Sequence, residues 1–219
     1  MKRHTVTGFF LLPVALGLML YAVVLTGLTG DIGFDADDWW ILSWSYWSPY
    51  PESVVIYAKE FLRPVEGLYW LSMFELFGFN RIAFHLCSLL LWIAASVIMG
   101  VCLTKAFPRD RIFVVVAVAL TFFLPTVSSL TYIIFTDNAR LSILLFWSAT
   151  FCFQSWAEKS TQWKGLLLPV LVYVLSFLTY ETASLMIFGI PFLVLPARAN
   201  RGADPYDRSF LVRLAIGIT

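Results

Sequence analysis

The chain alternates long apolar segments with short polar ones, and the lengths of the apolar segments predict helices that cross a membrane. A bilayer core about 30 Å thick takes roughly 20 apolar residues in a helix, because backbone groups in lipid must be hydrogen-bonded within the segment. We place the spans at 8–28, 82–104, 112–133, 139–156, 165–179 and 182–197. The predicted fold class is all-α: one polytopic membrane domain over residues 1–219, with about six transmembrane helices.

Three of the apolar runs can be interpreted in more than one way. The run at 8–28 is long for the apolar core of a signal peptide, so we retain it as the first span. The stretch 165–196 is too long for one crossing and is interrupted around Glu181, which predicts a helical hairpin with Glu181 near its tip. A last apolar run starts at Phe210 and stops halfway through a span. Either the chain is incomplete at its C-terminus, the interpretation we favour, or this run lies at the membrane interface.

The segment 29–81 is the one large loop, and its pattern predicts two amphipathic surface helices. Apolar residues recur at helical spacing over 53–62 and 65–77, on either side of Arg63-Pro64. We expect these helices to lie along the outer membrane surface, with the aromatic side chains of the loop at headgroup level. Those aromatic residues are Trp39, Trp40, Trp44, Trp47, Tyr50, Tyr57, Tyr69 and Trp70.

Composition excludes a water-soluble domain. The chain is 60% hydrophobic and 13% charged, with a mean hydropathy of +0.81, whereas soluble domains carry about 25% charge. A net charge of +1 implies no nucleic-acid partner. The three cysteines lie in apolar runs without metal-ligand spacing, so no metal site is expected from them.

The distribution of charge sets the orientation, because basic residues favour cytoplasmic loops. With the N-terminus inside, the inside segments contain Lys2, Arg3, Lys105, Arg109, Arg111, Lys159, Lys164, Arg198, Arg201, Arg208 and Arg213. The outside segments contain only Lys59, Arg63, Arg81 and Arg140. Both termini are therefore predicted to be cytoplasmic, and the compact loops favour a bacterial inner membrane.

The acidic cluster Asp35, Asp37 and Asp38 follows the first span. Carboxylates this close repel one another, which raises at least one pKa unless a divalent cation offsets the repulsion. Such a group could serve as a general base, and otherwise the cluster caps a helix starting near Trp39. No cofactor is expected, although a cation at this cluster remains an open alternative.

Five further polar residues are predicted on the same outer side. Arg63 could bind a phosphate, pair with Glu60 or Glu66, or reach lipid headgroups. His85 could reach substrate or be an ordinary interfacial histidine. Asp137 and Arg140, at i and i+3, could form a structural ion pair. Glu181 is an acid within an apolar hairpin, which marks it as a functional candidate.

These motifs resemble the C-type (GT-C) membrane glycosyltransferases, most closely the protein O-mannosyltransferase branch with its tetratricopeptide-carrying transmembrane members. The resemblance rests on the FDADDW motif at 34–39, Arg63-Pro64, the LFGFN motif at 76–80, the Phe-His-Leu at 84–86 and the LTYETA stretch at 178–183. The chain departs from that branch in carrying Ser88 and Trp92 where an asparagine and a histidine often follow the Phe-His. It also has Tyr180 where the branch has a lysine.

The resemblance implies a sugar donor on a polyprenyl-phosphate carrier and a protein or glycan acceptor. Carried over, Asp37 is the catalytic base and Asp38 the second acid, while Arg63 or His85 steadies the phosphate leaving group. Asp35, Arg140 and Glu181 join these as candidates for binding the substrate or the lipid phosphate. The rival hypothesis is a non-catalytic membrane protein, a transporter-like subunit or scaffold, whose acidic loop binds a cation or a partner.

Overall fold

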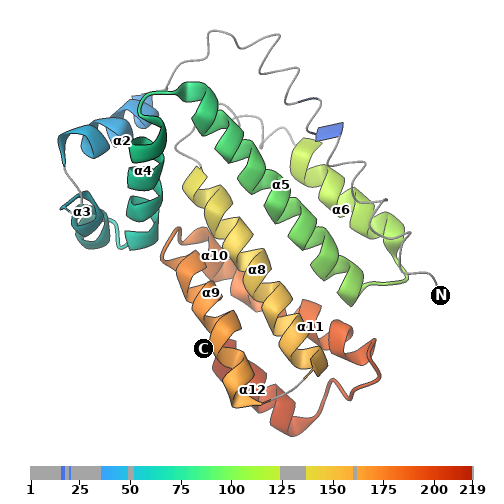
Figure 1. The fold of residues 1–219 in the computed structure, drawn as a ribbon. Coiled ribbons are helices and arrows are strands. Elements are labelled where there is room, and N and C mark those ends of the chain that lie inside the picture. The colour runs from blue at the N-terminus through green and yellow to red at the C-terminus, as the bar shows by residue number, and fades with distance from the viewer. Residues whose placement is uncertain are drawn as a thin grey trace.

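The fold is helical throughout the part of the chain that the computed structural model describes, residues 16–17, 20, 36–48, 52–123, 137–159 and 162–218. These ranges contain no strand, so the all-α prediction is confirmed. Two long helices, α5 (Arg81–Ala106) and α8 (Asp137–Lys159), pack side by side (Figure 1). Against this pair lie α6 (Arg111–Phe123), α9 (Leu167–Phe177) and α11 (Ile190–Ala199).

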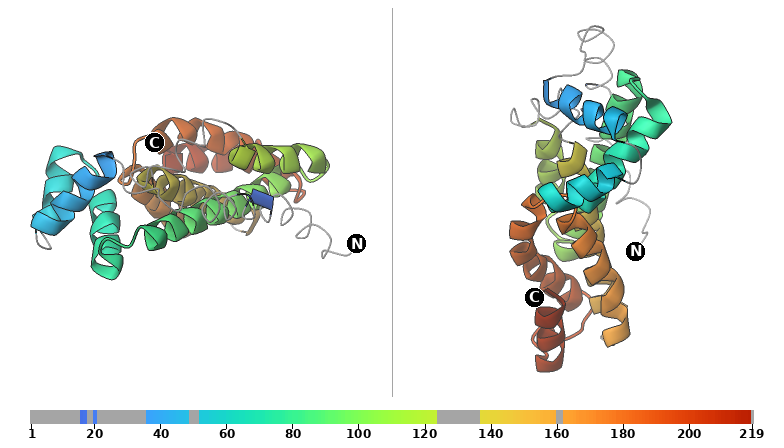
Figure 2. Two further views of the ribbon diagram at one scale, coloured as in Figure 1. Left: turned by 90° about the horizontal axis from the view of Figure 1, so that it is seen from above. Right: turned by 90° about the vertical axis from the view of Figure 1, so that its left-hand side faces the viewer.

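Three shorter helices form a layer at the N-terminal end of α5. They are α2 (Ala36–Trp47), α3 (Glu52–Glu60) and α4 (Pro64–Phe77), and Figure 2 shows them gathered at one end of the molecule. Their shared core consists of Ile41, Leu42, Tyr57, Trp70, Met73 and Phe84. Because Phe84 belongs to α5, this core attaches the layer to the bundle.

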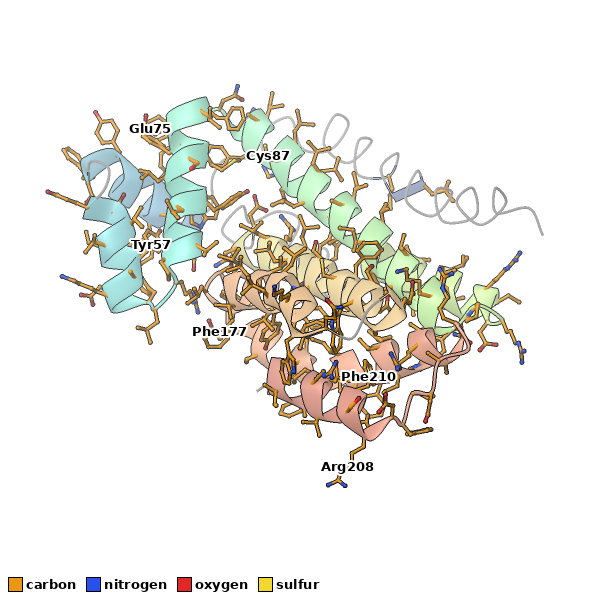
Figure 3. All side chains as sticks on the ribbon, turned by 60° about the horizontal axis from the view of Figure 1, so that its bottom comes forward. Tyr57, Glu75, Cys87, Phe177, Arg208 and Phe210 are labelled. Carbon is orange, nitrogen blue, oxygen red and sulfur yellow. The ribbon has the colours of Figure 1, made fainter. Side chains whose placement is uncertain are left out.

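The opposite end of the bundle has its own core around α8. A short helix η3 (Trp163–Leu166) precedes α9, while α10 (Thr182–Met186) and η4 (Ile187–Gly189) precede α11. The last helix, α12 (Arg208–Ile218), packs Phe210 on Trp156 with ring centroids 5.4 Å apart. Phe210 points into the bundle and Arg208 projects away from it (Figure 3). The apolar run that begins at Phe210 is therefore helical and packed against α8.

The ends of α4 and α5 are defined by local caps. Gly78 adopts φ +54°, which only glycine takes without strain, and its N–H donates to Phe74 O at 2.7 Å. The side chain of Asn80 accepts from Ala83 N and so caps α5. At the far end of α5, the Asn200 amide donates to Lys105 O and Ala106 O, each at 3.0 Å.

Polar side chains connect the helices inside the bundle. Gln154 on α8 donates from Nε2 to Cys102 O of α5 at 3.0 Å and to Leu193 O of α11 at 3.1 Å. Ser142 donates to Ser176 O at 3.0 Å and so connects α8 to α9. All three polar side chains are buried, so the bundle interior contains hydrogen-bonded polar groups.

The outer surface of the bundle is apolar. Its exposed large side chains include Ile82, Leu86, Leu90, Ile112, Phe113, Leu167, Leu171, Leu185, Phe188 and Phe192. Within the described residues one helix, α5, is long and apolar enough to cross a membrane, with a mean hydropathy of 2.4. The other apolar helices are shorter, at 111–121, 163–177 and 184–199. The prediction of about six spans stays a prediction, and most of the span 8–28 lies outside the described residues.

The expected row of headgroup-level aromatics is wrong at two positions. Tyr57 and Trp70 are buried, at 4% and 2% exposure, because Tyr57 packs against Gly67 of α4 and Trp70 stacks on Phe84 of α5. Figure 3 shows Tyr57 between α3 and α4. Trp39, Trp40 and Trp47 are exposed, as an aromatic surface requires. The side chains of Trp44 and Tyr50 lie outside the described residues.

Close packing of α3 on α4 depends on Gly67. A Cβ at this position would lie 2.7 Å from Tyr57 Cβ, so Gly67→Ala must separate the helices. We expect a loss of about 1–3 kcal/mol in stability from this overpacking, measured by thermal unfolding in detergent. Gly189→Ala, where a Cβ meets nothing within 4 Å, is the matched control and should not destabilise. Equal melting temperatures for the two variants would contradict this account of the α3–α4 contact.

Candidate functional site

Arg63 connects the helical layer to the turn between α9 and α10. It precedes Pro64, the first residue of α4, and follows Leu62, whose φ of +58° turns the chain sharply after α3. The guanidinium donates to Glu181 Oε1 at 2.5 Å and to Glu66 Oε2 at 3.4 Å. Burial alone would lower the pKa of Arg63, but the two carboxylates raise it above its usual value, so the guanidinium stays charged.

The turn that carries Glu181 is docked on α4 by two further contacts. The ring of Tyr180 lies 4.3 Å from the Arg63 guanidinium carbon, in cation–π geometry, and Val65 N donates to Leu178 O at 3.4 Å. Partial burial would raise the pKa of Glu181, but its backbone hydrogen bond and Arg63 hold that pKa below its usual value. Tyr180 occupies the position at which the protein O-mannosyltransferase branch has a lysine, and its aromatic ring lies against the Arg63 guanidinium.

Glu66 is the second acid on Arg63 and is buried. Its side chain is 2% exposed, and Oε1 accepts from Asn138 Nδ2 at 2.7 Å. Burial raises the pKa of Glu66 above its usual value, although the bond from Asn138 and the charge of Arg63 both oppose that rise. Glu66 therefore connects Arg63, which precedes α4, to Asn138 in the first turn of α8.

Asp137 and Arg140 form the ion pair that their spacing indicated, and the pair is buried at the start of α8. Asp137 Oδ2 also accepts from Tyr69 Oη of α4 at 3.0 Å. Arg140 donates in addition to Ser88 Oγ of α5. Ser88, at a position where the protein O-mannosyltransferase branch often has an asparagine, is thus a hydrogen-bond partner of Arg140. Together with these bonds, the Asp137–Arg140 ion pair holds α4, α5 and α8 together.

His85 lies on the same face of α5 as Ser88, one turn earlier. It is 5% exposed, and its Nε2 has no hydrogen-bond partner in the described part of the chain. Trp92, at a position where that branch often has a histidine, donates from Nε1 to Thr121 O of α6 at 3.2 Å.

The acidic cluster is only partly placed. Asp37 and Asp38 lie in the first turn of α2, which begins at Ala36, earlier than the sequence indicated. Their side chains and all of Asp35 lie outside the described residues. Since α2 packs on α4, the backbone of the two aspartates belongs to the same layer as Arg63. Over the described ranges, no group of three or more His, Cys, Asp or Glu side chains could hold a metal ion.

The structure brings Arg63 and Glu181 into direct contact and places Arg140 and His85 at the neighbouring junction of α5 with α8. Sequence reasoning missed Asn138, Tyr69 and Ser88 as members of this group, and it had Glu66 only as one of two partners for Arg63. The spacing of Arg63 and Glu66 at i and i+3 is a local signal. The bond from Asn138 to Glu66 joins residues 72 positions apart and leaves no such signal.

The result is a charged junction where α4, α5, α8 and the α9–α10 turn meet, with Arg63 at its edge. A guanidinium in this position can bind an oxyanion through two parallel hydrogen bonds. Comparison with family models, with curated proteins and with solved structures finds no match to this chain.

The buried ion pair predicts a strongly coupled double-mutant cycle. Asp137→Asn or Arg140→Gln alone leaves a buried charge without its partner, and each should cost about 3–5 kcal/mol of stability. The double variant should cost less than the sum, as thermal unfolding of purified protein would measure. Simple additivity would show that the pair contributes nothing to the α5–α8 junction.

The raised pKa of Glu66 predicts a pH dependence of stability. A carboxyl that binds its proton more tightly in the folded state makes stability fall as pH rises from the unfolded pKa to the folded one. Glu66→Gln lacks this titration, so the stability of wild type relative to the variant should decline over that interval and then level off. Melting temperatures measured from about pH 4 to 8 test this. The exposed Glu75→Gln should follow wild type, and parallel curves for wild type and Glu66→Gln would refute the assignment.

Proposed function

We propose that this chain is the membrane-embedded part of a GT-C type glycosyltransferase, which moves a sugar from a polyprenyl-phosphate carrier to an acceptor hydroxyl on the outer face. The observation that carries the proposal is the contact between Arg63 and Glu181. The two residues are 118 positions apart and belong to separate motifs of the resemblance. If the two motifs form one site, residues from both must come this close together.

A membrane setting accounts for the distribution of polar and apolar side chains. The bundle exposes large apolar residues such as Leu90, Leu167 and Phe192 while it buries Gln154 and Ser142. Exposed apolar area of this extent is costly in water and favourable in lipid. We therefore propose that the bundle lies in a membrane, where its polar side chains form hydrogen bonds between helices.

Basic residues at and just beyond the C-terminal end of α5, namely Lys105, Arg109 and Arg111, support the proposed orientation. Lys105, at its C-terminal end, pairs with Glu158 at 3.3 Å, and Arg201 pairs with the same glutamate at 3.5 Å. The junction lies toward the other end of α5, where Ser88 accepts from Arg140. In a bacterial inner membrane the basic end would face the cytoplasm, with both termini, and the junction would face outward.

In the proposed reaction, Asp37 takes the proton of the acceptor hydroxyl as its oxygen attacks the anomeric carbon of the sugar. The bond from that carbon to the phosphate oxygen breaks, and the electron pair stays on the phosphate. Arg63, with His85 as the other candidate, stabilises the negative charge that develops there. Asp38 is the second acid of the pair, and Asp35 and Arg140 are candidates for further contacts to substrate.

A non-catalytic role is the second candidate, and one observation favours it. Arg63, Glu66, Asp137 and Arg140 satisfy one another's charges within the fold. Such a network can serve to hold α4 on α8 in a transporter-like subunit or a scaffold. The acidic loop at Asp35, Asp37 and Asp38 would then bind a cation or a partner protein.

Sugar transfer separates the two candidates. Membranes containing the full-length gene product receive radiolabelled polyprenyl-phosphate sugars, and incorporation is compared between wild type and Asp37→Asn. We expect a loss of about 10²-fold or more, because general-base catalysis contributes at least that much. Asp110→Asn, an exposed aspartate in the loop after α5, is the matched control and should keep wild-type transfer. Equal incorporation in wild type and Asp37→Asn, or none with any donor, would favour the non-catalytic role.

A further inference from the structure

The two carboxylates on Arg63 differ in how firmly they are held. Glu66 is buried, with a side chain 2% exposed, and its second oxygen is bonded to Asn138. The side chain of Glu181 is 59% exposed and lies in the α9–α10 turn. One carboxylate is thus a fixed part of the packing, while the other meets Arg63 from the solvent side.

We propose that Glu181 is a displaceable counterion, which occupies on Arg63 the place that a phosphate oxyanion takes when the donor binds. This inference rests on the proposed function and deepens it. Glu66 and Tyr180 would hold the guanidinium in place throughout the exchange. Glu181 acts through Arg63 and is therefore a positioning residue.

Charge balance requires the exchange. With Glu66 and Glu181 both in contact, one cation already faces two anions. A phosphate added to the same guanidinium would bring a third negative charge to it, and like charges at such distances repel strongly. Departure of the exposed carboxylate restores the balance, whereas departure of Glu66 would also break its bond to Asn138.

The exchange is also inexpensive. Exposed ion pairs contribute little to stability, so opening the Arg63–Glu181 pair changes an equilibrium by only about two- to five-fold. Phosphate offers the guanidinium two oxygens in fork geometry, which a carboxylate at one nitrogen does not. The turn itself can stay docked, because the bond from Val65 N to Leu178 O does not involve Glu181.

Equilibrium binding of radiolabelled polyprenyl phosphate to the purified full chain in detergent tests this exchange. Glu181→Gln removes the competing charge and should tighten binding about two- to five-fold. Glu66→Gln should weaken binding, because it loosens the anchor of Arg63. Glu75→Gln, an exposed glutamate of α4, is the matched control and should bind as wild type does. Glu181→Asp, which keeps the charge but shortens its reach, should fall between wild type and Glu181→Gln.

Competition identifies the source of the oxyanion. Displacement of the labelled lipid by millimolar inorganic phosphate, together with tightening in Glu181→Gln, supports a site that recognises phosphate alone. No displacement, with the same tightening, supports the exchange on a lipid-linked phosphate. Unchanged or weaker binding by Glu181→Gln, or no binding by any variant, would overturn the exchange.

Failure of the exchange is distinguishable from failure of the enzymatic proposal. Tightening in Glu181→Gln without sugar transfer by wild type would leave the exchange standing and remove the enzyme. Transfer that depends on Asp37 without any tightening in Glu181→Gln would keep the enzyme and overturn the exchange. Melting temperatures of all variants, measured in the same detergent, show whether a change in binding reflects a change in folding.

Discussion

Charges that leave water need partners, and this constraint decides how the helices of the chain meet. Asp137 is fully buried, and Glu66 and Arg140 are nearly so. Each unpaired charge in such a place would cost several kcal/mol, about as much as a small domain's whole margin of stability. The side chains reach their partners only when α4, α5 and α8 have one relative register. The charged junction is therefore a structural requirement of the fold as well as a candidate site.

Sequence reasoning predicted the local features well and the long-range ones poorly. The apolar run at 82–104 became α5, the acid–base spacing of Asp137 and Arg140 became an ion pair, and the all-α class was confirmed. Helical spacing shows that a face is apolar, but lipid and protein cover such a face equally well. That ambiguity led to the wrong placement of Tyr57 and Trp70. The contact of Glu66 with Asn138 was missed for a different reason, because no local pattern in the sequence couples two residues in different helices.

Tyr180, Ser88 and Trp92, three positions at which the chain differs from the protein O-mannosyltransferase branch, each make a contact in this fold. A lysine at position 180 would place a second cation close to Arg63, whereas the Tyr180 ring offers it a favourable face. Ser88 accepts from Arg140, and Trp92 donates to a carbonyl of α6. Tyr180 and Ser88 thus each contact an arginine of this junction, while Trp92 connects α5 to α6.

Gln154 has a consequence for the order in which the bundle assembles. Its amide nitrogen bonds to Cys102 O of α5, which precedes it in the chain, and to Leu193 O, which follows 39 residues later. In the proposed membrane setting, α8 would enter the lipid with one of these acceptors already synthesised and the other still to come. The pairing of α8 with α5 could thus begin during synthesis, and α11 would complete it. A buried polar side chain in the C-terminal part of α8 would thus connect helices that are synthesised at different times.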